Sequence, residues 1–521
     1  MNAAPLPLLG REAREVGEQS RHGLQIGPPH QLLERLLGNV IQRRHHRRPF
    51  LCLSRDLPPA AHHPQLARAS RGSGTIPAHH HPGGFVMRRL TLLAVLVVAA
   101  LGVSTMVPAQ PKVAEVLIGS VLPLTGNFAS LGQQYLWASQ TVEDIVNNDY
   151  DIQVPLGPGK GFPGLGGAPI KFIVRDDQSR GEQARTIVEQ LISVNKVHWI
   201  NGEGTSGITS LIQPVVESAG MPLSCHPCAS PTLTEKGLKW FFRTGPNDKT
   251  MVASVFSFLK EWPERGGPRD LKTIALFTCD NLFCQDNRKV ATDLAPKAGF
   301  KIVLDLTTKT GATTLASEVQ RLQAANADVL FAVQYPAETV VFENDSKRAG
   351  YMPKVIATSN GAYSDETWLQ AQKKTNGAAG WLGRDPTAID LVHDRPAWKK
   401  VNEVYKKYSR GQNMGELAMR EITGLLWMAD VINRAKSVDP AALQKAANDT
   451  NMSPEQLIID YKGIKFENGQ NVLATGVVTQ VGWDGEKHTL WPWDLAARAN
   501  FKPIFPSPSW QERDSKPKPG N

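Results

Sequence analysis

Four cysteines in two closely spaced pairs are the first residues whose types and spacing could carry chemistry. Cys225 and Cys228 enclose His226, and Cys279 is followed by Cys284. A C-x2-C pair beside a histidine is typical of one half of a zinc site, and thiol-redox enzymes share its spacing. The second pair has C-x4-C spacing, which fits neither. Two local disulfides, Cys225 with Cys228 and Cys279 with Cys284, are therefore favoured over a metal site, and a metal site over a redox catalyst.

A glycine-rich stretch raises the possibility of a nucleotide cofactor. Gly159, Gly161 and Gly164 match G-x-G-x-x-G, the spacing of dinucleotide-binding loops. Such a loop must connect a strand to the start of a helix, whose free N–H groups hold the phosphate. These glycines instead follow a helical pattern that ends near Asn148 and precede a strand near Ile170. The stretch predicts a Gly/Pro surface loop and no nucleotide site.

The signatures of hydrolytic enzymes are missing from the sequence. It contains no G-x-S-x-G elbow and no H-E-x-x-H helix. The four histidines after residue 109 show no recognisable pairing by spacing: His198, His226, His393 and His488. We therefore expect no catalysis, no metal and no cofactor.

The first 109 residues have a different composition from the rest of the chain. They hold 13 arginines and no lysine against five acidic residues, so only about +1 of the net charge of +9 belongs to residues 110–521. A basic nucleic-acid surface is therefore not indicated. Residues 1–86 show no sustained apolar period, and we interpret them as a disordered or mis-assigned leader.

Residues 87–109 have the layout of a secretory signal peptide. Two arginines follow Met87, an apolar run extends from residue 91 to 103, and small residues surround Ala109. The apolar run is shorter than the roughly 20 residues of a spanning helix. We expect cleavage near Ala109, a mature chain that begins near Gln110, and a periplasmic location, where disulfides are stable.

From residue 116 onward, apolar runs of strand length alternate with amphipathic segments of helical period. This alternation predicts parallel sheets with helices on both faces, and a break near Pro246 divides it into two similar halves. The expected strands cover residues 116–123, 170–177, 197–201, 221–224, 273–278, 301–306, 328–333 and 354–359.

Four segments, residues 118–147, 170–192, 221–248 and 461–470, resemble the branched-chain amino-acid (Leu/Ile/Val) periplasmic binding proteins of ABC importers. The likeness extends over about residues 113–494. It implies an α/β type I periplasmic-binding fold, in which two doubly wound lobes with parallel sheets are joined by three crossovers. The expected division is 113–245 and 381–474 for the first lobe, 246–380 and 475–494 for the second, and 495–521 for a Pro/Lys-rich tail.

The expected ligand site lies beyond the carboxyl ends of the strands, where parallel sheets bind solutes. Thr205 and Ser206 begin a helix there, and their hydroxyls and N–H groups could receive a carboxylate. The resemblance places Thr205 at the carboxylate-binding serine of the family. It places one of Cys228, Ala229 and Ser230 at a second contact, because this loop is one residue longer than the family pattern.

The second lobe should supply the remaining contacts. The resemblance puts Gln334 or Tyr335 in the family's tyrosine region, and Asn360 where amino-acid binders carry an ammonium-binding glutamate. A neutral asparagine argues against an ordinary zwitterionic ligand. Tyr363 and Trp381 are the aromatic candidates for lining the cleft, although most tryptophans of the chain are expected in the core.

The function that follows from these features is the binding of a small molecule. We expect a monomer that delivers an amino acid, an amide or a small carboxylate to an inner-membrane ABC permease. The alternative is a ligand-binding sensor of the same fold that works without a transporter. Neither alternative involves nucleic acid.

Overall fold

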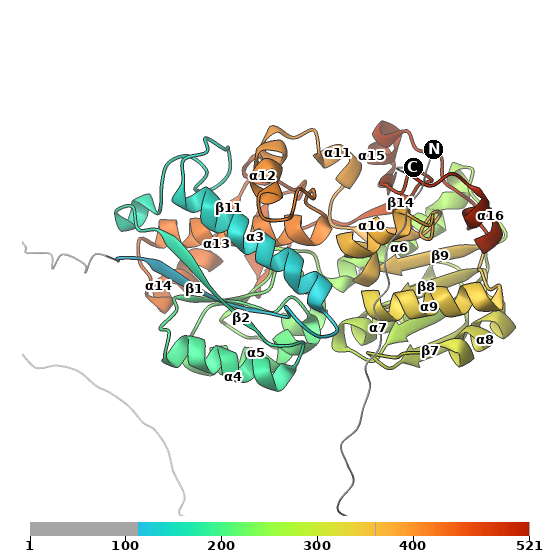
Figure 1. Cartoon of the computed structure of the whole chain (residues 1–521), viewed down its shortest axis with the longest axis horizontal. Helices are drawn as coiled ribbons and strands as arrows, with labels where there is room; N and C mark the ends of the chain where they lie inside the picture. Colours follow the sequence, from blue (N-terminus) through green and yellow to red (C-terminus); the bar gives the residue numbers. More distant parts are fainter. Residues whose placement is uncertain (1–112, 360, 520–521) are drawn as a thin grey trace, which may run out of the picture. The chain divides into compact units, whose positions relative to one another are not determined.

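The computed structural model describes residues 113–359 and 361–519, which form two α/β lobes (Figure 1). The expected leader and signal peptide, residues 1–86 and 87–109, lie outside the described residues. Within the described part of the chain, no helix combines the length and the apolar character needed to cross a membrane.

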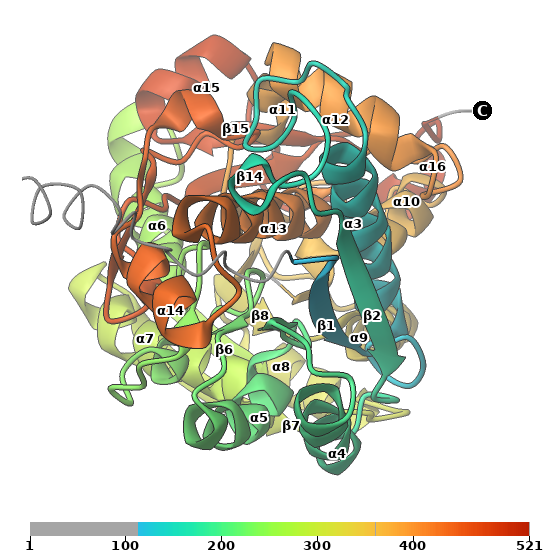
Figure 2. The ribbon, with the colours of Figure 1, turned by 90° about the vertical axis from the view of Figure 1, so that its left-hand side faces the viewer.

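The first lobe is built on a five-stranded parallel sheet in the order β2-β1-β3-β4-β5. Figure 2 shows α4 and α5 on one side of this sheet and α13 on the other. The elements are β1 (Val116–Leu122), α3 (Ala129–Asn147), β2 (Ile170–Asp176), α4 (Gly181–Ser193), β3 (Trp199–Asn201), α5 (Ser206–Ala219), β4 (Leu223–Ser224) and β5 (Phe241–Phe242).

A later part of the chain completes the first lobe. Its central element is α13, an almost entirely buried helix that packs along α3, and a small antiparallel sheet lies beyond it. The elements are α12 (Pro396–Lys406), α13 (Glu416–Ala435), α14 (Pro440–Asn448), β11 (Asn451–Met452), β12 (Ile464–Glu467) and β13 (Gln470–Asn471).

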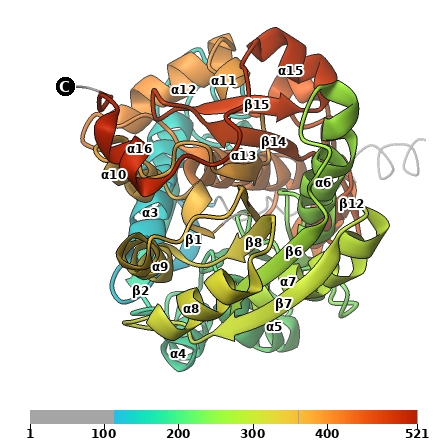
Figure 3. The ribbon, with the colours of Figure 1, turned by 90° about the vertical axis from the view of Figure 1, so that its right-hand side faces the viewer.

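The second lobe has a seven-stranded sheet in the order β15-β14-β10-β9-β8-β6-β7, seen in Figure 3. The strands from β10 to β7 are parallel, and β14 and β15 extend the sheet in antiparallel pairing. The elements are α6 (Asp248–Glu261), β6 (Thr273–Cys279), α7 (Leu282–Lys297), β7 (Lys301–Thr308), α8 (Ala316–Ala325), β8 (Val329–Val333), α9 (Pro336–Ala349), β9 (Val355–Ser359), α10 (Glu366–Lys373), β10 (Leu382–Asp385), α11 (Ile389–Val392), β14 (Val477–Val481) and β15 (Lys487–Trp491).

The described chain passes between the lobes after β5, after β10 and again between β13 and β14. One expected boundary needs correction. The sequence division returns the chain to the first lobe at residue 381, but β10 pairs with β9 and β14 inside the second sheet. The return therefore follows Asp385. The sequence did not indicate this strand, because β10 has only four residues, LGRD, and no apolar run marks it.

The glycine-rich stretch forms a loop between α3 and β2, as its position in the sequence predicts. Its third glycine has a packing role. A Cβ at Gly164 would lie 2.2 Å from the main-chain oxygen of Asn433, near the end of α13. The Gly164 N–H also donates to Asn433 Oδ1 over 2.7 Å. Gly164 therefore allows this loop to pack closely against α13.

Residues 495–519 extend the second lobe. This segment contains the end of α15 (Trp493–Ala499) and α16 (Trp510–Ser515). The Trp510 indole N–H donates to the Tyr351 carbonyl over 3.0 Å, and the Arg513 side chain is buried. The Asn376 side chain donates to the main-chain oxygens of Arg513 and Pro517. The Pro/Lys-rich composition of the tail gave no indication of this packing.

Candidate ligand-binding site

A small cavity with a volume of about 30 Å³ lies between the two lobes. It is at the carboxyl ends of the parallel strands, where the connecting loops of both sheets meet. The first lobe contributes Leu131, Tyr135, Gly204, Ser206, Pro227, Cys228, Ala229 and Leu417, and the second contributes Phe283, Tyr335 and Gly361. None of these described lining residues carries a charged side chain.

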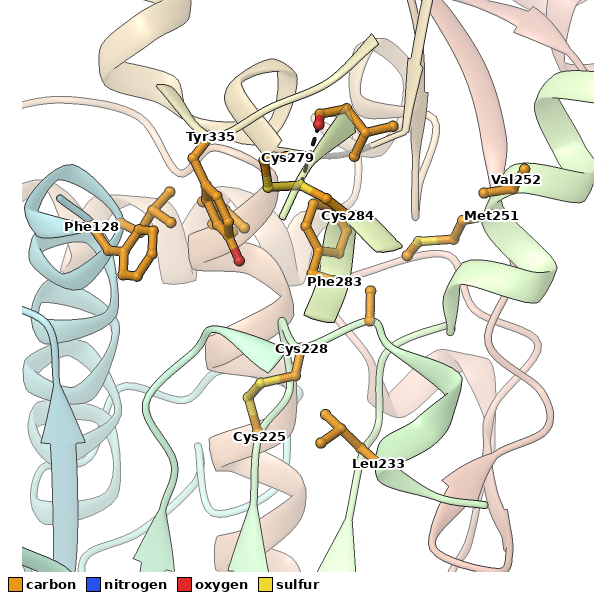
Figure 4. Close-up of a cluster of buried hydrophobic side chains, with 14 of the residues drawn as sticks. Phe128, Cys225, Cys228, Leu233, Met251, Val252, Cys279, Phe283, Cys284 and Tyr335 are labelled. Carbon is orange, nitrogen blue, oxygen red and sulfur yellow. Dashed lines mark hydrogen bonds between the residues drawn. A yellow bond between two sulfur atoms is a disulfide. The ribbon is translucent and has the colours of Figure 1, made fainter. Parts of the chain in front are cut away.

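One wall of the cavity is aromatic. Tyr335, the N-cap residue of α9, lies between Phe128 of the first lobe and Phe283 of the second (Figure 4). The ring centroids are 4.6 Å apart for Phe128 and Tyr335, and 5.7 Å apart for Phe283 and Tyr335. Burial raises the pKa of Tyr335 well above its usual value, so its phenol stays protonated. This wall is suited to an apolar or aromatic solute.

The polar end of the cavity is the start of α5. Ser206 is the first residue of this helix, and its Oγ accepts hydrogen bonds from the N–H groups of Ala229 at 3.2 Å and Ser230 at 3.1 Å. These hydrogen bonds join the start of α5 to the loop after β4, which also carries Cys228. Two of the predicted ligand-binding loops therefore meet at the cavity. The first N–H groups of a helix have no partner within the helix, so the site can receive a carboxylate or carbonyl oxygen.

Thr205, the other predicted residue at this helix start, contacts a protein carboxyl group. It does not line the cavity, and both its N–H, at 2.7 Å, and its hydroxyl donate to Glu203 Oε2. Glu203 is fully buried, and its other oxygen has no hydrogen-bond partner among the described residues. Burial and the nearby Asp177 raise the pKa of Glu203 well above its usual value. At this helix start, Ser206 lines the cavity and Thr205 does not.

Two other predicted residues are occupied by protein partners. The Ser230 hydroxyl donates to Asp286 of α7. Gln334 is buried and is not among the lining residues. Its Oε1 accepts a hydrogen bond from the Thr308 hydroxyl over 3.1 Å, and its Nε2 has no partner among the described residues. Its main-chain oxygen accepts from the Ala362 N–H.

The remaining second-lobe candidates do not meet at the cavity. The Tyr363 hydroxyl is 2.9 Å from Thr479 Oγ1 inside the lobe, and its ring covers Gly383. Trp381 packs on Trp368 with ring centroids 5.4 Å apart. Both aromatic side chains are buried in the core of the second lobe; Tyr363 follows β9, and Trp381 directly precedes β10. Asn360 lies outside the described residues.

The cysteines form the two expected local disulfides, Cys225–Cys228 and Cys279–Cys284. Figure 4 shows one in each lobe, on either side of Phe283. His226 is buried beneath the first, and burial lowers its pKa to about 3. No cluster of three or more side chains suited to a metal ion occurs in the described ranges.

Several lining residues were not anticipated from the sequence. Phe283 directly precedes Cys284, and a residue held inside a short disulfide loop could have been noted as a fixed side chain. Tyr135 and Leu131 belong to the apolar face of α3, which looks like ordinary core. Leu417 comes from α13, far along the chain, and no local signal indicates that it reaches the cleft.

A family model described as "Periplasmic binding protein" matches residues 115–482, most of the chain. The chain belongs to the periplasmic binding protein family. This family is non-enzymatic, so the activity to be explained for this periplasmic binding protein is binding and not catalysis.

Curated relatives match this chain over nearly their whole length. A Leu/Ile/Val-binding protein homolog 7 of Brucella abortus (strain 2308) is 26% identical over 411 residues, which cover 76% of this chain and 95% of the relative. A Leu/Ile/Val-binding protein homolog 8 of Brucella suis biovar 1 (strain 1330) is 26% identical over 432 residues, covering 79% and 100%.

Solved structures share the fold at lower identity. A leucine-binding protein, LivK, from Thermotoga maritima MSB8 superposes with a TM-score of 0.61 at 19% identity, over 73% of this chain and all of that one. A solute-binding protein of an ABC transporter from Rhodopseudomonas palustris BisB5, solved with 3,4-dihydroxybenzoic acid, gives 0.59 at 18% identity, over 73% and 96%. LivJ of Streptococcus pneumoniae, solved with isoleucine, gives 0.59 at 17%, over 72% and 97%.

Proposed function

We propose that this chain is an exported receptor that binds a small carboxylate or amide with an apolar or aromatic body and presents it to an inner-membrane ABC permease. The observation that carries the proposal is the cavity shared by the two lobes, which has a helix start at one end and an aromatic wall at the other. Export to the periplasm through residues 87–109 belongs to the same proposal, as does function as a monomer.

The chemistry of the lining favours a ligand without a cationic group. Ser206 and the N–H groups at the start of α5 match a carboxylate or carbonyl oxygen. An ammonium would need a charged acceptor, and the described lining offers only hydroxyls, main-chain atoms, apolar side chains and a disulfide. Asn360, predicted at the ammonium position of amino-acid binders, is neutral too.

Glu203 supports the same preference. It is close to the start of α5, and burial together with Asp177 raises its pKa, which weakens its repulsion of a carboxylate in the cavity. Relatives of the same fold were solved with isoleucine and with 3,4-dihydroxybenzoic acid, which represent the zwitterionic and the neutral-tailed class. A test must therefore separate these two classes.

The experiment compares solutes that differ in one group. Calorimetry with 4-methylpentanoic acid and leucine isolates the ammonium, while benzoic acid and benzamide isolate the carboxylate charge; 3,4-dihydroxybenzoic acid and isoleucine complete the panel. We expect 4-methylpentanoic acid to bind at least tenfold more tightly than leucine, which corresponds to about 1.4 kcal/mol. A bound solute at 100 times its dissociation constant should also add about 2.7 kcal/mol of stability.

Two variants of α5 provide the control. Ser206→Ala should weaken binding of whichever solute is retained, whereas Ser210→Ala, on the same helix but outside the cavity lining, should not. Tight stoichiometric binding of leucine would contradict the charge preference, and the absence of binding by the whole panel would contradict the solute class.

A further inference from the structure

Asp286 of the second lobe accepts hydrogen bonds from the first lobe. Asp286 lies on α7, and its Oδ2 receives the hydroxyl hydrogens of Ser230 and Thr232, the latter over 2.8 Å. Both donors belong to the loop that follows β4. Ser230 directly follows Ala229, which lines the cavity. The carboxylate therefore holds one ligand-binding loop of the first lobe against the second lobe.

Asp365 makes a second contact of the same kind. Ser130 Oγ donates to its Oδ2 over 2.5 Å, and Gln134 Nε2 donates to its Oδ1 over 3.1 Å. Both donors are on α3 of the first lobe, and Ser130 directly precedes Leu131, which lines the cavity. Asp365 itself is fixed in the second lobe, because it caps α10 through the Thr367 N–H at 2.7 Å.

The lobes also approach closely where α5 meets the start of α7. A Cβ at Gly207 would lie 2.9 Å from Oδ1 of Asn281, the residue that caps α7. Gly207 is in the first turn of α5, one residue after Ser206. A side chain at this position would therefore oppose the approach of the two lobes without changing the interior of either.

We propose that Asp286 and Asp365 are closure residues, which set the fraction of closed molecules, and hence ligand affinity, without touching the ligand. This proposal rests on the proposed binding function. When the lobes separate, the hydrogen bonds between the four donors and the two carboxylates are replaced by hydrogen bonds to water. These contacts therefore stabilise only the closed arrangement. The apparent dissociation constant rises in proportion as the binding-competent fraction falls.

The test measures the distance between the lobes. Nitroxide labels are placed on Val194→Cys and Val340→Cys, which are exposed positions on the first and second lobe, and pulsed electron resonance gives the distance distribution. Thr232→Ala and Ser130→Ala each remove one donor and leave Asp365 as the cap of α10. Gly207→Ala adds the opposing side chain. Ser139→Ala is the matched control, because its hydroxyl donates within α3 to the Tyr135 carbonyl.

The expected result is a closed component in the ligand-free protein that shrinks in Thr232→Ala, Ser130→Ala and Gly207→Ala and is unchanged in Ser139→Ala. With 3,4-dihydroxybenzoic acid and 4-methylpentanoic acid as probes, each of the three variants should weaken binding by about three- to tenfold, mainly through faster dissociation, and combining Thr232→Ala with Ser130→Ala should multiply the two effects.

A ligand-free protein without a closed component, or one whose closed component is the same in all variants, would overturn the proposal. A second contradicting result is an equal loss of thermal stability in Ser130→Ala and Ser139→Ala while the distance between the labels stays unchanged. That result would assign the Ser130 hydroxyl a purely local role and would also overturn the proposal. Since the distance measurement needs no solute, failure of every probe to bind would count against the proposed function alone.

Discussion

Glu203 and Thr205 are hydrogen-bonded to each other at the start of α5. Glu203 Oε2 accepts from the Thr205 N–H, at 2.7 Å, and from the Thr205 hydroxyl. The other glutamate oxygen and Asp177 Oδ2 have no hydrogen-bond partner among the described residues, although both side chains are fully buried. A proton on this acidic pair would lower the cost of burying two unpaired carboxylate oxygens.

The acidic pair predicts a pH-dependent stability. Burial raises the pKa of Asp177 to about 7, and burial together with Asp177 also raises the pKa of Glu203. The folded state holds these protons more tightly than the unfolded state, so the stabilisation is complete below pH about 4 and is lost as the pH rises through about 7. Asp177→Asn with Glu203→Gln should flatten the dependence of the unfolding free energy on pH by up to about 1.4 kcal/mol per pH unit for each group.

Guanidinium unfolding at pH 5 and pH 7 measures this slope. Asp293→Asn is the control, because its carboxylate is exposed on α7. An unchanged slope in the double variant would show that the two carboxyls are ionised in the folded protein.

Substitutions of two phenylalanines, one in the aromatic wall and one in the core, should affect ligand affinity and protein stability differently. Phe283→Leu should weaken binding of an aromatic or apolar solute by about tenfold, because the ring lines the cavity and supports Tyr335. Phe342→Leu, in the second-lobe core beside Phe277, should lower stability and leave affinity unchanged. Calorimetry and thermal unfolding on both variants distinguish the two effects, and equal affinities in both variants would remove Phe283 from the site.

The disulfide in the second lobe should act on the same residue. Replacing Cys279 and Cys284 by serine should cost stability near the low end of about 2–4 kcal/mol, because the loop it closes is short. Affinity should fall as well, since Phe283 lies inside that loop. Mass mapping of non-reduced digests checks the pairing first, and a peptide linking Cys225 to either Cys279 or Cys284 would refute it.

Gly164 provides a test of the loop that resembles a nucleotide motif. Gly164→Ala should destabilise the protein by about 1–3 kcal/mol, because the new Cβ collides with the Asn433 carbonyl. Gly159→Ala meets no atom within 4 Å and should cost about 1 kcal/mol, from its left-handed backbone alone. Equal costs would show that the contact with α13 does not decide the choice of glycine.

The start of the mature chain is a prediction from sequence. If Met87 is the working initiator, a chain beginning there should be exported and its new N-terminus should read Gln110-Pro111, which N-terminal sequencing would establish. Tryptic peptides from residues 1–86 in native cells would contradict this.

Local patterns in the sequence were sufficient for the architecture and insufficient for the site. Apolar runs such as residues 273–278 and 328–333 became strands because each is buried on both faces of a parallel sheet. The short strand β10 was assigned to the wrong lobe, since pairing with β9 is a long-range property.

The same contrast holds for individual residues. Ser206 could be placed at a helix start from the sequence, but the partner of Thr205 could not, because Glu203 looks like any polar loop residue until its burial is known. Tyr363 follows β9 and Trp381 directly precedes β10, and both side chains are buried in the second lobe. Whether an aromatic side chain points to the cleft or to the core depends on long-range packing, which the sequence does not show.

The first lobe is assembled from two stretches of chain separated by the entire parallel part of the second. The apolar face of α3 is covered by α13, which begins at Glu416, so a growing chain that has reached only β5 cannot bury it. Contacts of such large sequence separation slow folding, because a long loop must close before they form. In a chain with this connectivity, the core of the first lobe can be completed only after α13 has been synthesised.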